Sequence, residues 1–196
     1  MSSLKETKRR IVSVKNTQKI TRAMKLVSSA KYAKAQQRKK RAETYRAEFE
    51  ELVIDLIAES NKETIWFGSQ KTEKKSLLLV LSSDRGLCGS YNSGLFKELS
   101  FFLNENKDID FYFKLWGRKT KQFKGIAENK IIESSEWVLD KISEEFAKTS
   151  ARQIVKAYKQ GEYDGVYIAY SSFQSALTQP PVVKRLLPFD LKNIDL

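Results

Sequence analysis

The hydrophobic and polar positions along the first 58 residues predict one long helix. No glycine occurs before Gly68 and no proline before Pro180, so nothing in this stretch interrupts helical hydrogen bonding. At about 1.5 Å rise per residue, such a helix would be roughly 85 Å long, several times the usual length in a globular domain. Most of this helix must therefore leave its own domain and requires a partner.

The two halves of this helix differ in their apolar residues. Between Ile11 and Ala35 the apolar positions are sparse and often small, which lets two helix backbones approach closely, although the seam is too polar for a strong coiled coil. From Tyr45 onward larger side chains recur at helical spacing, which predicts that this end is anchored on a domain core. The spaced residues are Tyr45, Phe49, Leu52, Val53, Leu56 and Ile57.

The rest of the chain alternates predicted strands and helices. Continuous apolar or aromatic runs predict strands at residues 76–83, 110–116 and 165–170, and paired prolines mark an extended segment at 175–189. Amphipathic spacing predicts helices at residues 90–104, 119–123 and 138–158. This alternation predicts an α/β domain with a mostly parallel sheet flanked by helices. The expected organisation is a shaft helix at 1–58, a connector at 59–75, a globular domain at 76–190 and a further connection starting at 191–196.

Charge divides the chain in the same way. Residues 1–46 carry fifteen Lys or Arg and two acidic residues, a net charge of +13, whereas the whole chain carries +12, so residues 47–196 sum to −1. This distribution indicates a nearly neutral body holding a cationic helix, whose partner surface we expect to be acidic. A basic N-terminus also occurs in transit peptides, but here the pattern continues for 46 residues into the apolar stripe.

The turn DRGLCG at residues 84–89 separates a predicted strand from a predicted helix, where α/β proteins often bind phosphates. It contains neither GxGxxG nor GxxxxGK[ST], and it lacks the arginine of a cysteine phosphatase loop. Cys88 has no histidine anywhere in the chain to activate it. We therefore interpret the segment as a tight turn in which Asp84 caps the helix or pairs with Arg85.

Other chemistry is weakly supported by the composition. The chain has one cysteine and no histidine, so we predict no metal site, no cofactor and no internal disulfide. The basic residues 1–46 include only Tyr32 and Tyr45 as aromatic residues, which is no stacking platform for a nucleic acid. An α/β enzyme and a nucleic-acid-binding protein with a basic arm therefore remain the alternatives to a mechanical or interaction subunit.

Three separated stretches of the chain are distinctive: SLKETKRRIVSVKNTQKITRAMKLVSSAKYAKAQ at residues 3–36, LVLSSDRGLCGSYNSGL at 79–95 and YSSFQSALTQPPVVKRLLPF at 170–189. These motifs resemble the gamma subunit of the F-type ATP synthase. The motifs occur in the family's order, and the likeness covers almost the whole chain. The KNTQKITRAMK block and the SSDRGLCG turn are its most specific parts.

The resemblance implies a non-catalytic rotor subunit. In that family the N-terminal helix pairs with a C-terminal helix as an antiparallel coiled coil, inside a ring of three alpha and three beta subunits that gives a 3:3:1 complex. The α/β domain rests on the membrane c-ring beside the epsilon subunit. The implied task is to transmit torque between ion flow through the membrane sector and nucleotide chemistry on the beta subunits. Neither a cofactor nor a specific nucleic acid is implied.

The resemblance also suggests residues for these contacts. Lys19, Arg22, Met24 and Lys25 match the region that the family brings near the acidic lever loop of the beta subunit. The turn is expected to help shape contacts with neighbouring rotor subunits, without a separate role for each of its residues, which are Asp84, Arg85, Gly86, Cys88, Tyr91 and Asn92. The family continues beyond residue 196 into its long C-terminal helix, so residues 1–196 alone cannot complete the coiled coil. A complex on the cytoplasmic face of a bacterial plasma membrane is favoured, with a mature organellar protein as the alternative.

Overall fold

The structure is a computed structural model that describes residues 3–59, 66–67, 72–123, 125–137 and 142–189. The chain divides into two compact units between residues 60 and 61. Part of the expected connector, residues 138–141 and the expected further connection at 191–196 lie outside the described residues. None of the described helices is both long enough and apolar enough to cross a bilayer.

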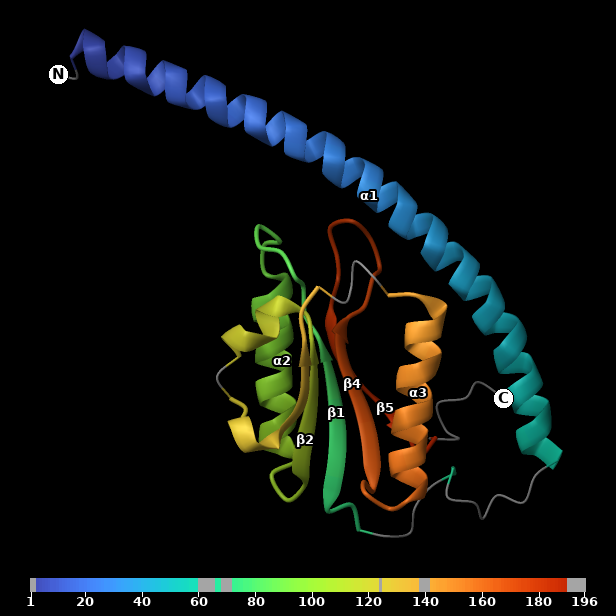
Figure 1. Ribbon diagram of the computed structural model, residues 1–196. Coiled ribbons are helices and arrows are strands. Elements are labelled where there is room, and N and C mark those ends of the chain that lie inside the picture. The colour runs from blue at the N-terminus through green and yellow to red at the C-terminus, as the bar shows by residue number, and fades with distance from the viewer. Residues whose placement is uncertain (1–2, 60–65, 68–71, 124, 138–141, 190–196) are drawn as a thin grey trace. The chain divides into compact units, whose positions relative to one another are not determined.

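The first unit is a single helix, α1 (Leu4–Glu59), 56 residues long (Figure 1). Its backbone confirms the predicted unbroken helix. Side-chain pairs one turn apart support it locally: Glu6 with Arg10 at 2.7 Å and Glu43 with Lys39 at 3.0 Å. Tyr45 and Phe49 stack with ring centroids 6.1 Å apart, whereas the side chains of Leu52, Val53, Leu56 and Ile57 lie outside the described part. The predicted anchoring of this end on a core therefore remains a prediction.

The second unit contains a five-stranded sheet in the order β3-β2-β1-β4-β5. Its strands are β1 (Lys75–Leu81), β2 (Asp110–Trp116), β3 (Ile131–Ser135), β4 (Gly165–Ser171) and β5 (Pro181–Leu187). Strands β1, β2, β3 and β4 run parallel to one another, and β5 pairs antiparallel with β4. The prediction of a mostly parallel sheet is confirmed.

Helices cover the two faces of this sheet, α2 (Tyr91–Glu105) on one and α3 (Glu144–Lys159) on the other (Figure 1). Because strand side chains alternate between faces, β1 contributes to two cores. Leu78 and Val80 pack in the cluster that includes α2, and Leu77 and Leu79 pack in the cluster that includes α3. The continuous apolar run of β1 is thus explained by burial on both sides.

Two predicted elements were partly wrong, and one strand was missed. The segment at residues 119–123 is a 3-10 helix, η1 (Arg118–Gln122), because it is too short for α-helical turns. The helix predicted from residue 138 begins only at Glu144, where the Ser143 hydroxyl caps it by accepting the Phe146 N–H at 3.1 Å. Strand β3, which follows a second 3-10 turn, η2 (Glu128–Lys130), was not predicted at all.

Candidate partner-binding surfaces

The basic stretch of α1 holds the four residues assigned to a catalytic-subunit contact. Lys19, Arg22, Met24 and Lys25 are all exposed and lie within seven consecutive residues of one helix. Residues three apart, such as Lys19 and Arg22, are neighbours on a helix surface, so their positive charges reinforce one another. Their contact with a partner remains a prediction, since the structure contains this chain alone.

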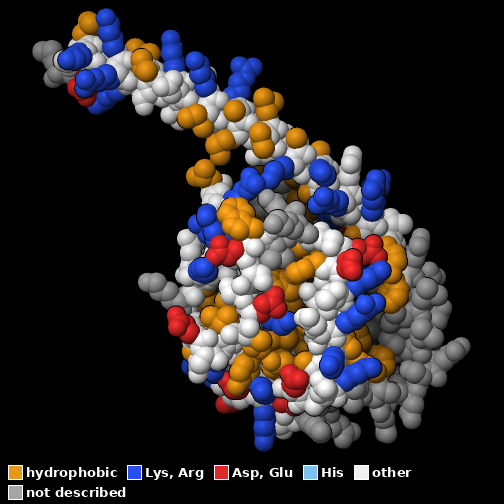
Figure 2. All heavy atoms as spheres, viewed as in Figure 1, with side chains coloured by type: hydrophobic (Ala, Val, Ile, Leu, Met, Phe, Trp, Pro, Cys, Tyr) orange, Lys and Arg blue, Asp and Glu red, His pale blue; other side chains and the backbone are white. Residues whose placement is uncertain are grey.

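The charged residues of the helix around these four positions are all basic. Residues 7–42 contain thirteen Lys or Arg and no acidic residue. Figure 2 shows the resulting series of basic side chains along the helix. Along a helix, neighbouring side chains lie three or four residues away, so no carboxylate of α1 lies within one turn of the middle of this stretch. Such a surface attracts an acidic partner and repels a basic one.

The second candidate surface is the turn between β1 and α2, and its inner side is organised by Asp84. This residue is only 6% exposed, and its Oδ1 accepts the backbone N–H groups of Arg118 at 2.9 Å and Trp137 at 2.8 Å. Those residues follow β2 and β3, so one carboxylate ties together the loops at the carboxyl ends of three parallel strands. The interpretation of Asp84 as a helix cap is wrong: the N-cap position of α2 is Ser90, which makes no capping hydrogen bond with its side chain.

Asn92 fastens the same turn to the first turn of α2. Its Oδ1 accepts the Ser83 N–H at 3.0 Å, and its Nδ2 donates to Ser83 Oγ at 2.9 Å and to Cys88 Sγ at 3.1 Å. The thiol also lies 3.8 Å from the Arg85 carbonyl oxygen. An amide, a hydroxyl and a carbonyl are poor proton acceptors for a thiol, so this arrangement shapes the turn and offers no activation of Cys88.

The outer side of the turn is exposed. Arg85, Gly86 and Cys88 face solvent, and Leu87 between them is 91% exposed with a φ of 60°. Tyr91 is half-buried, and this burial raises the pKa of its hydroxyl. The six predicted turn residues therefore separate into buried Asp84 and Asn92, half-buried Tyr91, and an exposed remainder that is accessible to another protein.

Sequence reasoning missed Trp137, which lies at the same edge of the sheet. Its φ is 59°, its N–H binds Asp84, and the Arg118 guanidinium lies 5.1 Å from the centre of its ring. No motif surrounds this residue, and residues 118 and 137 are far from residue 84 in the sequence. Only the parallel order of β1, β2 and β3 brings them together.

Candidate metal ligands do not gather in the described part of the chain. Among residues that the structure places, no three His, Cys, Asp or Glu side chains lie close enough to hold a metal ion. At the turn between β1 and α2, the described side chains of Arg85, Leu87 and Cys88 are exposed.

Comparisons with known proteins converge on one family. The family model described as ATP synthase matches residues 3–195. The chain is 36% identical over 190 residues to the ATP synthase gamma chain of Geotalea daltonii, covering 96% of this chain and 66% of that one. It is 38% identical to the gamma chain of Bdellovibrio bacteriovorus, covering 97% and 65%, and 33% identical to that of Geobacter sp. strain M21, covering 100% and 68%. The chain thus spans about two thirds of the length of these relatives.

Solved structures give the same fold. The rotor of the Euglena gracilis mitochondrial ATP synthase contains a chain that superposes with a TM-score of 0.53 at 16% identity, covering 91% of this chain and 60% of that one. At this identity the likeness shows the fold alone. The family follows from the match over residues 3–195 and from the gamma-chain relatives: the chain belongs to the ATP synthase gamma chain family.

Proposed function

We propose that this chain is the central-stalk rotor subunit of a rotary ATP synthase and is itself non-catalytic. The main supporting observation is the 56-residue basic helix α1 in a member of the gamma-chain family. All side chains at residues 3–46 are exposed within the chain. A helix of this length and charge needs an external partner to cover it. Residues 1–58 serve as the shaft, 59–75 as the connector and 76–190 as the foot.

The proposed partners are the alpha and beta subunits in a 3:3:1 complex, the epsilon subunit and the membrane c-ring. The subunit is peripheral, and the bacterial relatives favour the cytoplasmic face of a bacterial inner membrane. Its task is to transmit torque between ion flow and ATP synthesis or hydrolysis on the beta subunits. An asymmetric shaft presents a different face to each beta subunit, and rotating that face moves the conformational bias around the ring.

Lys19, Arg22, Met24 and Lys25 supply the shaft's contact with the acidic lever loop of the beta subunit. All four are exposed, and no acidic residue of the helix lies within a turn of them. Long cationic side chains against an acidic loop attract it with little geometric specificity, which suits a sliding contact. At the foot, Arg85, Gly86 and Cys88 face neighbouring rotor subunits, while Asp84 and Asn92 hold the turn in shape next to the half-buried Tyr91.

Reconstitution tests the rotor function directly. The chain, both as residues 1–196 and extended to the length of its relatives, is mixed with alpha and beta subunits at physiological salt. We expect a 3:3:1 complex with rotation-linked ATP hydrolysis, which excess nucleic acid does not dissociate. If the extended chain fails to join the hexamer, the rotor function is wrong. If nucleic acid outcompetes the hexamer at that salt concentration, the basic helix serves nucleic-acid binding instead.

A charge reversal tests the contact residues. Lys25→Glu would place a carboxylate against the acidic loop, and because exposed ion pairs contribute up to about 1 kcal/mol, we expect coupled ATP synthesis to fall by about fivefold. Lys40→Glu makes the same charge change elsewhere on α1 and serves as the matched control. Equal ATP synthesis rates for wild type and Lys25→Glu would contradict the assignment of this residue.

A further inference from the structure

The topology of the sheet brings the two connections of the second unit to one place. Strand β1 starts beside the start of β4, with Ser76 opposite Gly165. Strand β5 runs the other way and ends there, with Leu187 opposite Val166. The chain therefore enters and leaves the sheet at the same edge, although these two segments are more than a hundred residues apart in the sequence.

At this edge the two segments bind each other. Phe67 and Phe189 form a parallel β-bridge, and the Phe189 N–H donates to the Trp66 carbonyl oxygen at 2.6 Å. The rings of Phe67 and Phe189 lie with their centroids 6.1 Å apart, within the range of aromatic attraction. A backbone hydrogen bond and a ring contact thus join the segment before β1 to the segment after β5.

Trp66 fastens this pair to the core. Its ring packs against the cluster that contains Leu77 and Leu187, 6.1 Å from the ring of Tyr158 on α3. The Lys159 ammonium lies 5.1 Å from the centre of the Trp66 ring, which adds a cation–π attraction. The consecutive residues Trp66 and Phe67 thus make separate contacts, one with the core and one with the departing chain.

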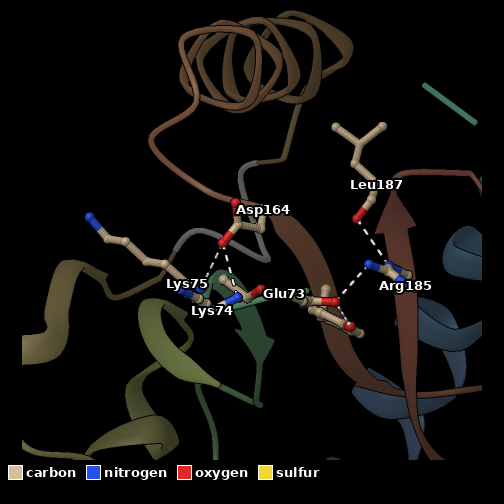
Figure 3. Close-up of polar contacts among 8 residues, drawn as sticks. Glu73, Lys74, Lys75, Asp164, Arg185 and Leu187 are labelled. Carbon is tan, nitrogen blue, oxygen red and sulfur yellow. Dashed lines mark hydrogen bonds and ion pairs between the residues drawn. The ribbon is translucent and has the colours of Figure 1, made fainter. Parts of the chain in front are cut away.

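A polar network reinforces the same edge (Figure 3). Glu73 Oε2 accepts from Arg185 Nη2 at 2.6 Å and from the Tyr167 hydroxyl at 3.0 Å, and Glu73 Oε1 accepts from the Ser76 hydroxyl. Asp164 Oδ2 accepts the N–H groups of Lys74 and Lys75, both at 3.0 Å. The segment that leads into β1 is thereby bonded to β4 and β5 before the strand begins.

We propose that Trp66, Phe67 and Phe189 form a torque-bearing joint. The joint clamps the segment before β1 to the segment after β5, so that the foot and the shaft turn together. The inference rests on the proposed rotor function. A single polypeptide tether swivels about its backbone single bonds and passes little torque. Two segments clamped to each other and to a core cannot swivel independently, because rotation must first break their contact.

Hydrogen exchange at the Phe189 amide tests the clamp in the full-length subunit. Replacing Phe67 by Ala removes the ring contact, and we expect the Phe189 amide to exchange about fivefold faster, as loss of one aromatic pair implies. Phe67→Leu removes the aromatic ring but keeps a large apolar side chain, so it distinguishes loss of the ring contact from a folding defect. Phe101→Ala, on the exposed surface of α2, is the matched control and should leave this exchange unchanged. Unchanged exchange in both Phe67 variants would overturn the clamp.

Coupling in the assembled ATP synthase tests the torque role. In both Phe67 variants we expect ATP-driven ion pumping per ATP hydrolysed to fall by about fivefold, while hydrolysis continues, because the shaft turns without moving the foot fully. Relative to a Cys88→Ser parent, which accounts for any effect of that change alone, a Phe67→Cys, Phe189→Cys, Cys88→Ser variant should match the parent's coupling when oxidised and fall below it when reduced. Wild-type pumping ratios in the Phe67 variants would overturn the joint while leaving the rotor function intact. Failure of the wild-type complex to assemble would overturn the rotor function and, with it, the torque role.

Discussion

Every described side chain of α1 up to Arg46 is exposed, whereas the second unit buries Leu78, Leu95 and Leu99 completely. The helix is held by hydrogen bonds and ion pairs between residues four apart. The sheet unit is held by apolar area removed from water on both faces of the sheet. The stability of the sheet unit should therefore depend mainly on the volume of its buried side chains. The stability of the helix should depend mainly on unbroken backbone hydrogen bonding and on charge.

The largest effect is expected from a cavity in the sheet unit. Leu99→Ala should lower the free energy of unfolding by about 2–5 kcal/mol, because a fully buried leucine leaves a void that its neighbours fill only partly. The exposed Val27→Ala of α1 should change it by less than about 0.5 kcal/mol. Urea unfolding followed by tryptophan fluorescence measures the sheet unit, because Trp66, Trp116 and Trp137 all lie in it. Similar values for the two variants would contradict the comparison.

A break in the helix should leave the sheet unit untouched. Ala30→Pro removes a hydrogen bond in the middle of α1 and disfavours the helix by about 3 kcal/mol locally. Because α1 has 56 helical residues against 15 in α2 and 16 in α3, the ellipticity at the helical band should fall clearly. The urea midpoint from tryptophan fluorescence should not move. A shifted midpoint would mean that the two units do not unfold separately; Ala30→Gly, with a milder penalty, is the control.

High pH should weaken the sheet unit through Tyr167. Burial, followed by the neighbouring Glu73 carboxylate, raises the pKa of Tyr167 to about 12, while Arg185 opposes the shift. A pKa raised above the unfolded value of about 10 means that this stabilisation is complete below pH 10 and is lost as the pH rises to 12. Two pKa units correspond to about 2–3 kcal/mol.

Unfolding in urea at pH 9 and at pH 11.5 measures this loss. Tyr167→Phe should lose less stability between the two values than wild type, because the group that titrates is gone. Tyr45→Phe, at an exposed position of α1, is the matched control. An equal loss in wild type and Tyr167→Phe would show that this hydroxyl does not govern the pH dependence.

The smallest effect concerns helix ends. The Ser143 hydroxyl caps α3, so Ser143→Ala should cost about 1 kcal/mol. Ser28→Ala, in the exposed middle of α1, has no capping role and should slightly favour the helix through its propensity. Thermal unfolding followed by tryptophan fluorescence measures the stability of Ser143→Ala, and the helical ellipticity measures the helix content of Ser28→Ala. A destabilised α1 in Ser28→Ala would contradict the view that only local propensity acts there.

Much of the fold could be predicted because its signals are local. The lack of Gly and Pro predicted α1, and the apolar runs of β1, β2 and β4 predicted buried parallel strands. Strand β3 has five residues at the sheet edge that alternate between half-buried and exposed, and this pattern is too short and too polar to identify. The assignment of Lys19, Arg22, Met24 and Lys25 to a partner contact came from the resemblance and remains a prediction; the structure shows that all four are exposed within the chain.

The preference of each segment for helix or strand, and the separation of a cationic helix from a nearly neutral domain, can be predicted from sequence because they depend on residues close together in the chain. The binding of Asp84 to the amides of Arg118 and Trp137, and the contacts of Trp66 and Phe67 with Phe189, arise from the fold of the sheet unit. These contacts join residues 34 to more than 100 positions apart. A hydrogen-bond donor or an aromatic ring has many possible partners at such distances, and the strand order selects one of them.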